Sequence, residues 1–175
     1  ILETGYPSDH YFTAWQPAAD QIRSRLPGRV VICFQDNVYK KDIIYSRSMH
    51  NALYQMFIRV LDSRDDVALL VKPKVLGTWV SMKRRLPKLE RLCAEGRIQV
   101  LSNTDRRATP ALAGMASDLV VGLGISTAAI ECQFAGIPSL HADLTDIQGN
   151  PFKTAGIGRV VFSDIPSLEA AVDDV

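Results

Sequence analysis

The chain has 175 residues and a formal net charge of +1, with 47% hydrophobic and 22% charged residues. This length allows one domain with a substantial core, and this composition excludes an intrinsically disordered chain. The near-neutral charge argues neither for nor against a nucleic-acid partner. No apolar run approaches the length needed to span a membrane, and no signal peptide is visible.

The cysteines indicate the compartment. Cys33, Cys93 and Cys132 are odd in number, far apart in the sequence and without metal-ligand spacing. They predict buried thiols in a reducing cytoplasm.

The two ends of the sequence read as parts of a longer polypeptide, since the first residue is Ile1 and the last residues read as a helix that simply stops. We expect residues 1–15 to be an entry segment from a missing preceding domain. Residues 16–175 are expected to form a single Rossmann-like domain.

Strand and helix patterns alternate along the chain. Buried strands are predicted at residues 30–34, 67–71, 98–101, 119–121, 139–141 and 160–162. Helical patterns are predicted at residues 18–26, 49–62, 82–96, 110–116, after residue 127, and at 167–173. Pro87 either kinks the third of these helices or begins its second half. The alternation predicts an α/β fold with a doubly wound, six-stranded parallel sheet in the order 3-2-1-4-5-6.

The strongest local signal is DLVVGLGISTAAIECQFAGIP at residues 118–138. Its short β-branched run predicts a strand, after which Gly122 and Gly124 allow a sharp turn and a close approach to the backbone. Ser126 or Thr127 can cap the helix that follows. Such a strand, turn and helix N-terminus predict an anion site, because free N–H groups and the helix dipole point to the same place.

Glu131 is not explained by helix capping, since a capping box would place a Glu three residues after the cap. It lies four residues after Thr127 and therefore one turn further along the same helix face. A carboxylate held there can bind adjacent ribose hydroxyls, and a solvated helix carboxylate is an equal alternative.

Polar residues follow the strands that flank the predicted ligand crevice. In a sheet of this order, ligands bind beyond the carboxyl ends of the strands where the strand order reverses, here between the first and fourth strands. Gln35, Asp36 and Asn37 end the first strand and face that point. Lys72 ends the second strand and can neutralise a phosphate, with a solvated lysine as the alternative.

Several chemistries lack their motifs. No G-x-G-x-x-G follows the first strand, no Walker lysine follows the glycines, and no G-x-S-x-G elbow occurs. No Asp-x-Asp pair is present, so a divalent-metal site is not indicated. His141 is expected to be a loop histidine rather than a contact to a base or sugar, and His10 and His50 belong to no recognisable constellation.

A cationic run follows the second strand. A solvated helix face is the ordinary interpretation, and an anionic acceptor or a membrane surface is the alternative. The run consists of Lys83, Arg84, Arg85, Lys88 and Arg91.

Three segments resemble the carboxyl-terminal, nucleotide-sugar-binding domain of GT-B-type glycosyltransferases of the surface and capsular carbohydrate type. Residues 5–9, GYPSD, are similar to the Gly-x-Pro-x-x-Asp entry between the two domains of such enzymes. Residues 71–73, Val-Lys-Pro, are similar to the Lys-x-x-Pro region, although many of these proteins have His-Pro there. Residues 118–138 are similar to the segment that runs from Asp-Leu-Val-Val-Gly through a helix Glu to Gly-Ile-Pro.

The resemblance implies the donor-binding half of an enzyme that moves a sugar from a nucleotide-sugar to a polysaccharide or lipid-linked acceptor. It implies diphosphate contacts from Gly124, Ser126 and Thr127, and a ribose contact from Glu131. The expected nucleotide-sugar-binding residues are Gly122, Gly124, Ser126, Thr127, Glu131, Lys72, Asp36 and Asn37.

No catalytic residue, cofactor or metal is expected in this half. The resemblance places the acceptor, and with it the catalytic base, on the missing amino-terminal domain, so we expect this domain to bind donor without turning it over. The whole protein is expected to be cytoplasmic, in peripheral contact with a membrane and without a nucleic-acid partner. A sugar-nucleotide 2-epimerase-like domain and a non-catalytic regulatory or protein-binding domain stay open as alternatives.

Overall fold

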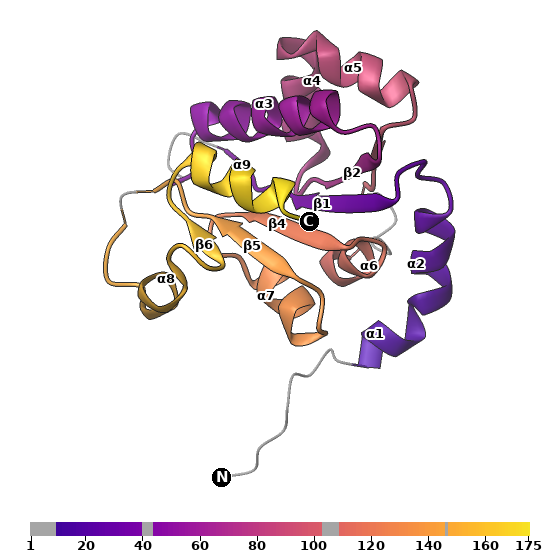
Figure 1. Ribbon diagram of the computed structural model, residues 1–175. Helices are drawn as coiled ribbons and strands as arrows, with labels where there is room; N and C mark the ends of the chain where they lie inside the picture. Colours follow the sequence, from indigo (N-terminus) through magenta and orange to yellow (C-terminus); the bar gives the residue numbers. More distant parts are fainter. Residues whose placement is uncertain (1–9, 40–43, 103–108, 146) are drawn as a thin grey trace.

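The computed structural model describes residues 10–39, 44–102, 109–145 and 147–175 (Figure 1). These residues form a six-stranded, all-parallel sheet in the order β3-β2-β1-β4-β5-β6. The strands are β1 (Val30–Gln35), β2 (Val67–Lys72), β3 (Ile98–Val100), β4 (Leu119–Leu123), β5 (Ser139–Ala142) and β6 (Val161–Phe162). The predicted fold class and strand order are confirmed.

Most helices lie where a helical pattern is predicted, but the sequence analysis predicts none at residues 10–14 or 151–156. They are α1 (His10–Ala14), α2 (Gln16–Arg23), α3 (Arg47–Ser63), α4 (Leu76–Arg85), α5 (Pro87–Ala94), α6 (Pro110–Met115), α7 (Thr127–Phe134), α8 (Pro151–Gly156) and α9 (Ile165–Asp173). Pro87 begins α5, which confirms the second of the two alternatives for this residue. The GYPSD segment at residues 5–9 lies outside the described residues.

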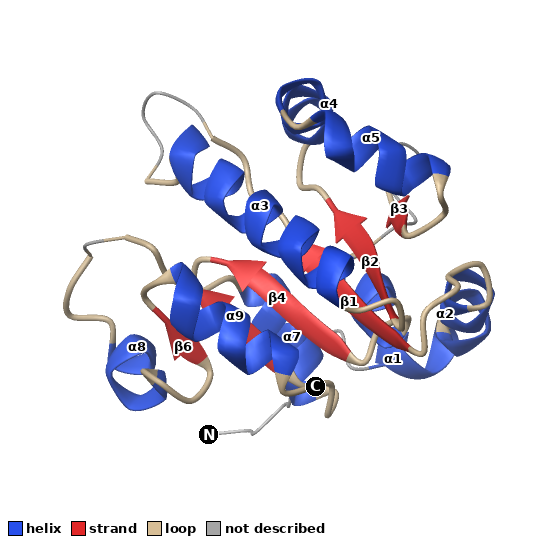
Figure 2. Ribbon diagram, turned by 45° about the horizontal axis from the view of Figure 1, so that its top comes forward, coloured by secondary structure: helices blue, strands red, loops and turns tan. Residues whose placement is uncertain are grey.

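The two faces of the sheet bury separate apolar clusters. Alternate residues such as Ile32 and Phe34 point to the face covered by α3, α4, α5 and α9. The intervening residues, Val31 and Cys33, point to the face covered by α2, α6 and α7. In Figure 2, α3 and α9 lie on the same side of the sheet and contact each other. Helices on both faces are the reason that the central strands are apolar throughout.

Strand register aligns four residues near the carboxyl edge of the sheet. Gln35 of β1 pairs with Lys72 of β2 on one side and with Gly122 of β4 on the other. Gly122 pairs in turn with His141 of β5. Residues paired in this way point to the same face, and here that is the face covered by α6 and α7.

Asp118 links elements at the amino ends of the central strands. Its Oδ2 accepts hydrogen bonds from the backbone N–H of Val31 and from the Arg23 guanidinium, both at 2.7 Å. The first residue of the 118–138 segment therefore ties β4 to β1 and α2. It lies at the amino ends of the strands, at the other end of the sheet from the predicted crevice.

The ends of some elements differ from prediction. The helix predicted at residues 18–26 begins earlier, at Gln16, because Pro17 in its first turn already has a helical φ. Cys33 and Cys132 are buried as predicted, but Cys93 is only half-buried. Across the described ranges, no helix combines the length and apolarity that crossing a bilayer requires.

Candidate functional site

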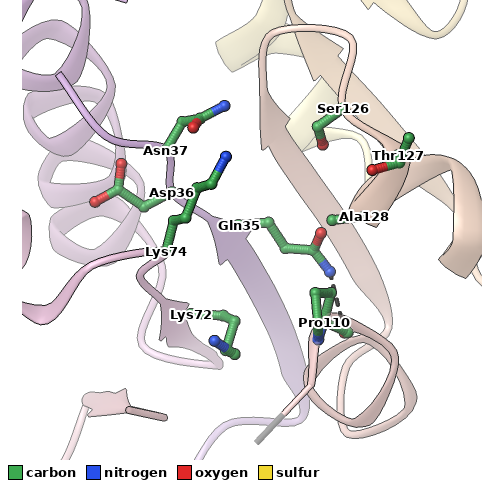
Figure 3. Close-up of a pocket in the computed structure, with 9 residues that line it drawn as sticks. All are labelled: Gln35, Asp36, Asn37, Lys72, Lys74, Pro110, Ser126, Thr127 and Ala128. Carbon is green, nitrogen blue, oxygen red and sulfur yellow. Dashed lines mark hydrogen bonds between the residues drawn. The ribbon is translucent and has the colours of Figure 1, made fainter. Parts of the chain in front are cut away.

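A pocket of about 270 Å³ opens at the carboxyl edge of the sheet, between β1 and β4 (Figure 3). This is the point where the strand order reverses, as the sequence predicts. The residues that line it come from the ends of β1 and β2 and from the starts of α6 and α7. They are Gln35, Asp36, Asn37, Lys72, Lys74, Pro110, Ser126, Thr127 and Ala128.

Gln35 forms the floor of the pocket, and its amide orientation is fixed. Its Nε2 donates to the carbonyl of Pro110 at 3.1 Å and to Cys132 Sγ at 3.4 Å. Its Oε1 is buried and has no hydrogen-bond donor among the described residues. The side chain is only 4% exposed, so an unpaired acceptor is held beside the pocket.

Lys72 is buried beside Gln35, which rules out the solvated-lysine alternative. It is 6% exposed, and its Nζ donates to the Pro73 carbonyl at 3.4 Å. Within the described ranges it forms no ion pair with a carboxylate. Burial lowers the pKa of Lys72, and Cys33 opposes this shift in part. Among the described residues, its ammonium group therefore has no carboxylate counter-charge, which a buried lysine ordinarily has.

Lys74 adds a second cation to the same wall. It follows β2 by two residues, is exposed, and extends beside Asn37 toward the mouth of the pocket (Figure 3). Lys74 is not among the binding residues predicted from the sequence. The Lys-Pro-Lys spacing could have indicated it, because both lysines directly follow the strand that flanks the crevice.

The amino end of α7 forms the opposite wall. Ser126 is the N-cap, and its Oγ accepts a hydrogen bond from the backbone N–H of Ala129 at 3.4 Å. The N–H groups of Thr127 and Ala128, at the first two helical positions, have no intrahelical acceptor. Gly122 allows the start of α7 to pack closely against β4, since a Cβ at position 122 would lie 3.1 Å from Ser126 Oγ and 3.0 Å from Ala129 Cβ.

Gly124 lies in the turn between β4 and α7, with a φ of +74°. It does not line the pocket; instead, the ring of Tyr45 packs directly against it. Tyr45 also lines a smaller pocket of about 110 Å³, together with Asp143 and Thr145 among others. Asp143 there is paired with Lys153 at 3.0 Å and accepts the Thr145 hydroxyl at 2.6 Å.

Asp36 and Asn37 lie at the pocket in different ways. The Asp36 carboxylate is turned toward α3, away from Ser126 and Thr127 (Figure 3), because successive strand residues point to opposite faces. Its Oδ2 accepts the Tyr54 hydroxyl at 2.9 Å, and its Oδ1 lies 2.9 Å from His50 Nε2. Asn37 Oδ1 accepts the backbone N–H of Val38 at 3.0 Å, which leaves the amide N–H groups of Asn37 toward the pocket side.

The predictions for two of the three histidines, His50 and His141, are wrong. His50 does belong to a constellation, the buried group with Asp36 and Tyr54. His141 is not a loop histidine but a buried residue of β5 with its ring edge-on to Phe152 at 5.1 Å. Neither of its ring nitrogens has a hydrogen-bond partner in the described structure. Burial lowers the pKa of His141, and the backbone of Gly124 partly opposes this shift.

Glu131 lies in the middle of α7 and is half-buried. Its spacing from Thr127 places it one turn further along the same side of the helix. It is not among the residues that line the pocket. Its ribose contact stays a prediction.

The cationic run on α4 and α5 is largely paired with neighbouring carboxylates. Lys83 pairs with Glu90 at 3.1 Å, and Lys88 pairs with Asp62. Arg84 and Arg85 are exposed. These ion pairs and exposed side chains are those of an ordinary solvent-exposed helix face.

Fold and site together define a doubly wound, Rossmann-like α/β domain with a cationic pocket at its switch point. Among the described residues, no three His, Cys, Asp or Glu side chains gather as metal ligands do. No model of a known protein family matches the sequence, and no curated protein matches it significantly.

Proposed function

We propose that this chain binds a nucleotide-sugar and forms the donor-binding half of a glycosyltransferase that acts on a polysaccharide or lipid-linked acceptor. The main support for this proposal is that Lys72 and Lys74 lie across one pocket from the amino end of α7. Two ammonium groups and a helix N-terminus supply positive potential from both sides, as a diphosphate requires.

Gln35 supports a ligand that carries more than phosphate. Its buried Oε1 lacks a donor, and the bonds from Nε2 to Pro110 and Cys132 prevent the amide from turning over. An ionised phosphate cannot donate to this oxygen. A hydroxyl of a sugar or an N–H of a base can, and a nucleotide-sugar contains both kinds of group alongside its diphosphate.

The size of the pocket also bears on the ligand. At about 270 Å³ it lies just below the range of small-molecule sites, which begins at about 300 Å³. It accommodates the diphosphate and part of one neighbouring ring, so the rest of a nucleotide-sugar would extend from the mouth. In a two-domain transferase this is where the acceptor-bearing half would meet it.

A thermal-shift and calorimetric titration tests the proposal. UDP, CDP and GDP are compared with inorganic pyrophosphate, and at least one nucleotide is expected to raise the melting temperature. At a hundred times the dissociation constant, the ligand adds about 2.7 kcal/mol to the free energy of unfolding. Pyrophosphate is expected to bind more weakly because it offers no donor to Gln35.

The matched control is a pair of variants that remove one positive charge each. Lys74→Ala is expected to weaken nucleotide binding, whereas Arg85→Ala removes an exposed charge from α4, outside the pocket, and is expected to leave it unchanged. Equal loss in both variants would show a non-specific charge effect. Absence of any shift with every nucleotide at millimolar concentration would overturn the proposal.

Two further measurements separate the alternatives. A sugar-nucleotide epimerase would bind the same ligands but invert a sugar carbon, which NMR of the nucleotide-sugar after incubation would detect. A regulatory domain would bind the nucleotide without discriminating the sugar. Affinity for the nucleotide-sugar above that for the nucleoside diphosphate is the result expected of a donor site.

A further inference from the structure

The imidazole of His50 lies between oxygen acceptors on both sides. Its Nδ1 is 2.9 Å from the carbonyl of Ser46, and its Nε2 is 2.8 Å from the carbonyl of Asn37. Nε2 also lies 2.9 Å from Asp36 Oδ1. The His50 side chain is wholly buried, so no bulk water can replace any of these partners.

These contacts determine the protonation state of the ring. A carbonyl or carboxylate oxygen can only accept a hydrogen bond, and a neutral imidazole carries a single N–H. Either neutral tautomer would therefore point a nitrogen lone pair at an oxygen less than 3 Å away. The imidazolium form carries an N–H on each ring nitrogen and can donate to the acceptors on both sides.

The counter-charge for this cation is Asp36. Both side chains are fully buried, and the other carboxylate oxygen of Asp36 accepts the Tyr54 hydroxyl at 2.9 Å. Asp36 Oδ1 has no well-aligned hydrogen-bond donor in the described structure, so with His50 protonated the 2.9 Å contact is an attraction between opposite charges. Loss of the proton from His50 would leave a buried carboxylate uncompensated, which is strongly unfavourable.

The same ring holds the polar end of β1. Asp36 and Asn37 directly follow Gln35 and line the pocket, and Ser46 is the N-cap of α3. His50 thus joins the pocket wall to the first turn of α3 through both ring nitrogens. It also cancels the negative charge that Asp36 would otherwise place behind a pocket lined by Lys72 and Lys74.

We propose that His50 is a positioning residue of the pocket: as an imidazolium it fixes the backbone of Asp36 and Asn37 and neutralises Asp36, which favours an anionic ligand. The part that concerns the ligand rests on the function proposed above. The part that concerns charge and position does not.

The groups around the imidazole determine the direction in which the pKa of His50 is shifted. Burial lowers the pKa of His50, but the adjacent Asp36 carboxylate and the carbonyls of Ser46 and Asn37 outweigh this effect, so the pKa is raised. Among the described residues, the other titratable groups that hydrogen bonds or ring contacts place here are phenols: Tyr54 contacts Asp36, and Tyr39 lies edge-on to the imidazole at 5.0 Å. Arg47 lies over the Tyr39 ring at 5.2 Å and is the nearest further cation that these contacts place.

A ligand-free NMR titration of the 175-residue protein tests the charge and the positioning. The ¹⁵N shifts of His50 are expected to show two protonated ring nitrogens at pH 7, where an ordinary histidine is largely neutral. His141, whose pKa is lowered, serves as an internal neutral reference. The backbone amides of residues 35–37 are expected to shift together with His50 as its proton is lost at higher pH.

A second experiment tests the effect on binding. Affinity for UDP, CDP and GDP is measured from pH 6 to 9 in the unmodified protein and in His50→Gln. The unmodified protein is expected to lose about three- to tenfold in affinity as the imidazolium is lost, a step that the variant lacks. Tyr54→Phe removes a hydrogen bond from Asp36 but no charge, so it is expected to keep the step.

The outcomes separate this inference from the proposed function. A neutral His50 at pH 6, or amides of residues 35–37 that do not follow its titration, would overturn the inference even if nucleotides bind. A pH step that persists in His50→Gln would overturn its ligand part. Failure of every nucleotide to bind would overturn the proposed function and the ligand part together, while the ligand-free titration would still decide whether the ring is charged and positions the strand end.

Discussion

The ring of Tyr45 packs against the Cα of Gly124. A Cβ at position 124 would lie 2.5 Å from both Cε1 and Cζ of the ring, and the φ of Gly124 is +74°. Two separate constraints therefore require glycine here: the left-handed backbone and the space that the tyrosine fills. Burial, and then the nearby Asp143 carboxylate, raise the pKa of Tyr45, which keeps its hydroxyl protonated at neutral pH.

Gly124→Ala is expected to destabilise the fold by about 2–5 kcal/mol. A left-handed backbone at a non-glycine residue costs roughly 1–3 kcal/mol, and forcing extra volume into a packed contact costs about as much again. Urea unfolding followed by circular dichroism measures the change.

Two controls separate these causes. Gly158 has a similar φ of +71° but nothing within 4 Å of its Cβ position, so Gly158→Ala reports the backbone cost alone. Tyr45→Ala in the Gly124→Ala background removes the collision and is expected to recover the remainder. If Gly124→Ala and Gly158→Ala cost the same, the Tyr45 contact has no energetic weight.

Lys72→Met is expected to stabilise the unliganded protein and weaken nucleotide binding. Burial lowers the pKa of Lys72, so the charged form is disfavoured in the fold at every pH below that value. Replacing this buried ammonium, which has no carboxylate partner among the described residues, by an apolar chain of similar length removes the cost. Each kcal/mol gained raises the melting temperature by about 2–4 °C.

The effect of Lys72→Met on nucleotide binding is expected to be unfavourable, in contrast to its effect on stability. Loss of a charge-assisted hydrogen bond to phosphate is worth about 1.5–3 kcal/mol, or roughly ten- to a hundredfold in affinity. In the unmodified protein, stability is expected to rise with pH as Lys72 loses its proton, and the variant lacks this rise. A variant that is both less stable and unaltered in binding would contradict the role given to Lys72.

The sequence alone was sufficient for the sheet order and for the position of the pocket. Both follow from alternation of elements and from one topological rule, which need no side-chain detail. The direction of Asp36 was also within reach of that reasoning. Residues of β1 alternate between the faces, so Phe34 and Asp36 point to α3 while Gln35 points to α6 and α7.

The pairing of His50 with Asp36 could not be found from spacing. These residues are 14 positions apart and belong to different elements, and their contact depends on where α3 crosses β1. The same holds for Tyr45 and Gly124, which meet only because Tyr45 lies against the β4–α7 turn. Contacts of this kind are set by helix packing, which no local pattern encodes.

Glu131→Ala is expected to weaken nucleotide binding without unfolding the domain. Alanine is the better helix former, so the helix loses little, whereas a lost hydrogen bond between a carboxylate and a ribose hydroxyl costs roughly 1.5–3 kcal/mol. Calorimetric titration of ribose and 2′-deoxyribose nucleotides measures the effect. If the unmodified protein binds both equally, Glu131 does not contact the 2′-hydroxyl.

Nucleotide binding is expected to survive removal of divalent metal. The charge on the diphosphate would be met by Lys72, Lys74 and the amino end of α7, which already face one pocket. A magnesium ion bound by the protein would instead need carboxylate oxygens, and the two buried carboxylates that the described residues place near the carboxyl ends of the strands already have partners. Asp36 contacts Tyr54 and His50, while Asp143 contacts Lys153 and Thr145.

Titration with UDP, CDP and GDP in EDTA and in magnesium measures the difference directly. Equal dissociation constants in the two buffers are the expected result, together with a loss of affinity at high salt because the contacts are electrostatic. Affinity that disappears in EDTA and returns with magnesium would show that a cation shares the phosphate contact. Since Asp143 can be freed only by breaking its pair with Lys153, Asp143→Asn would then identify whether that carboxylate is the ligand.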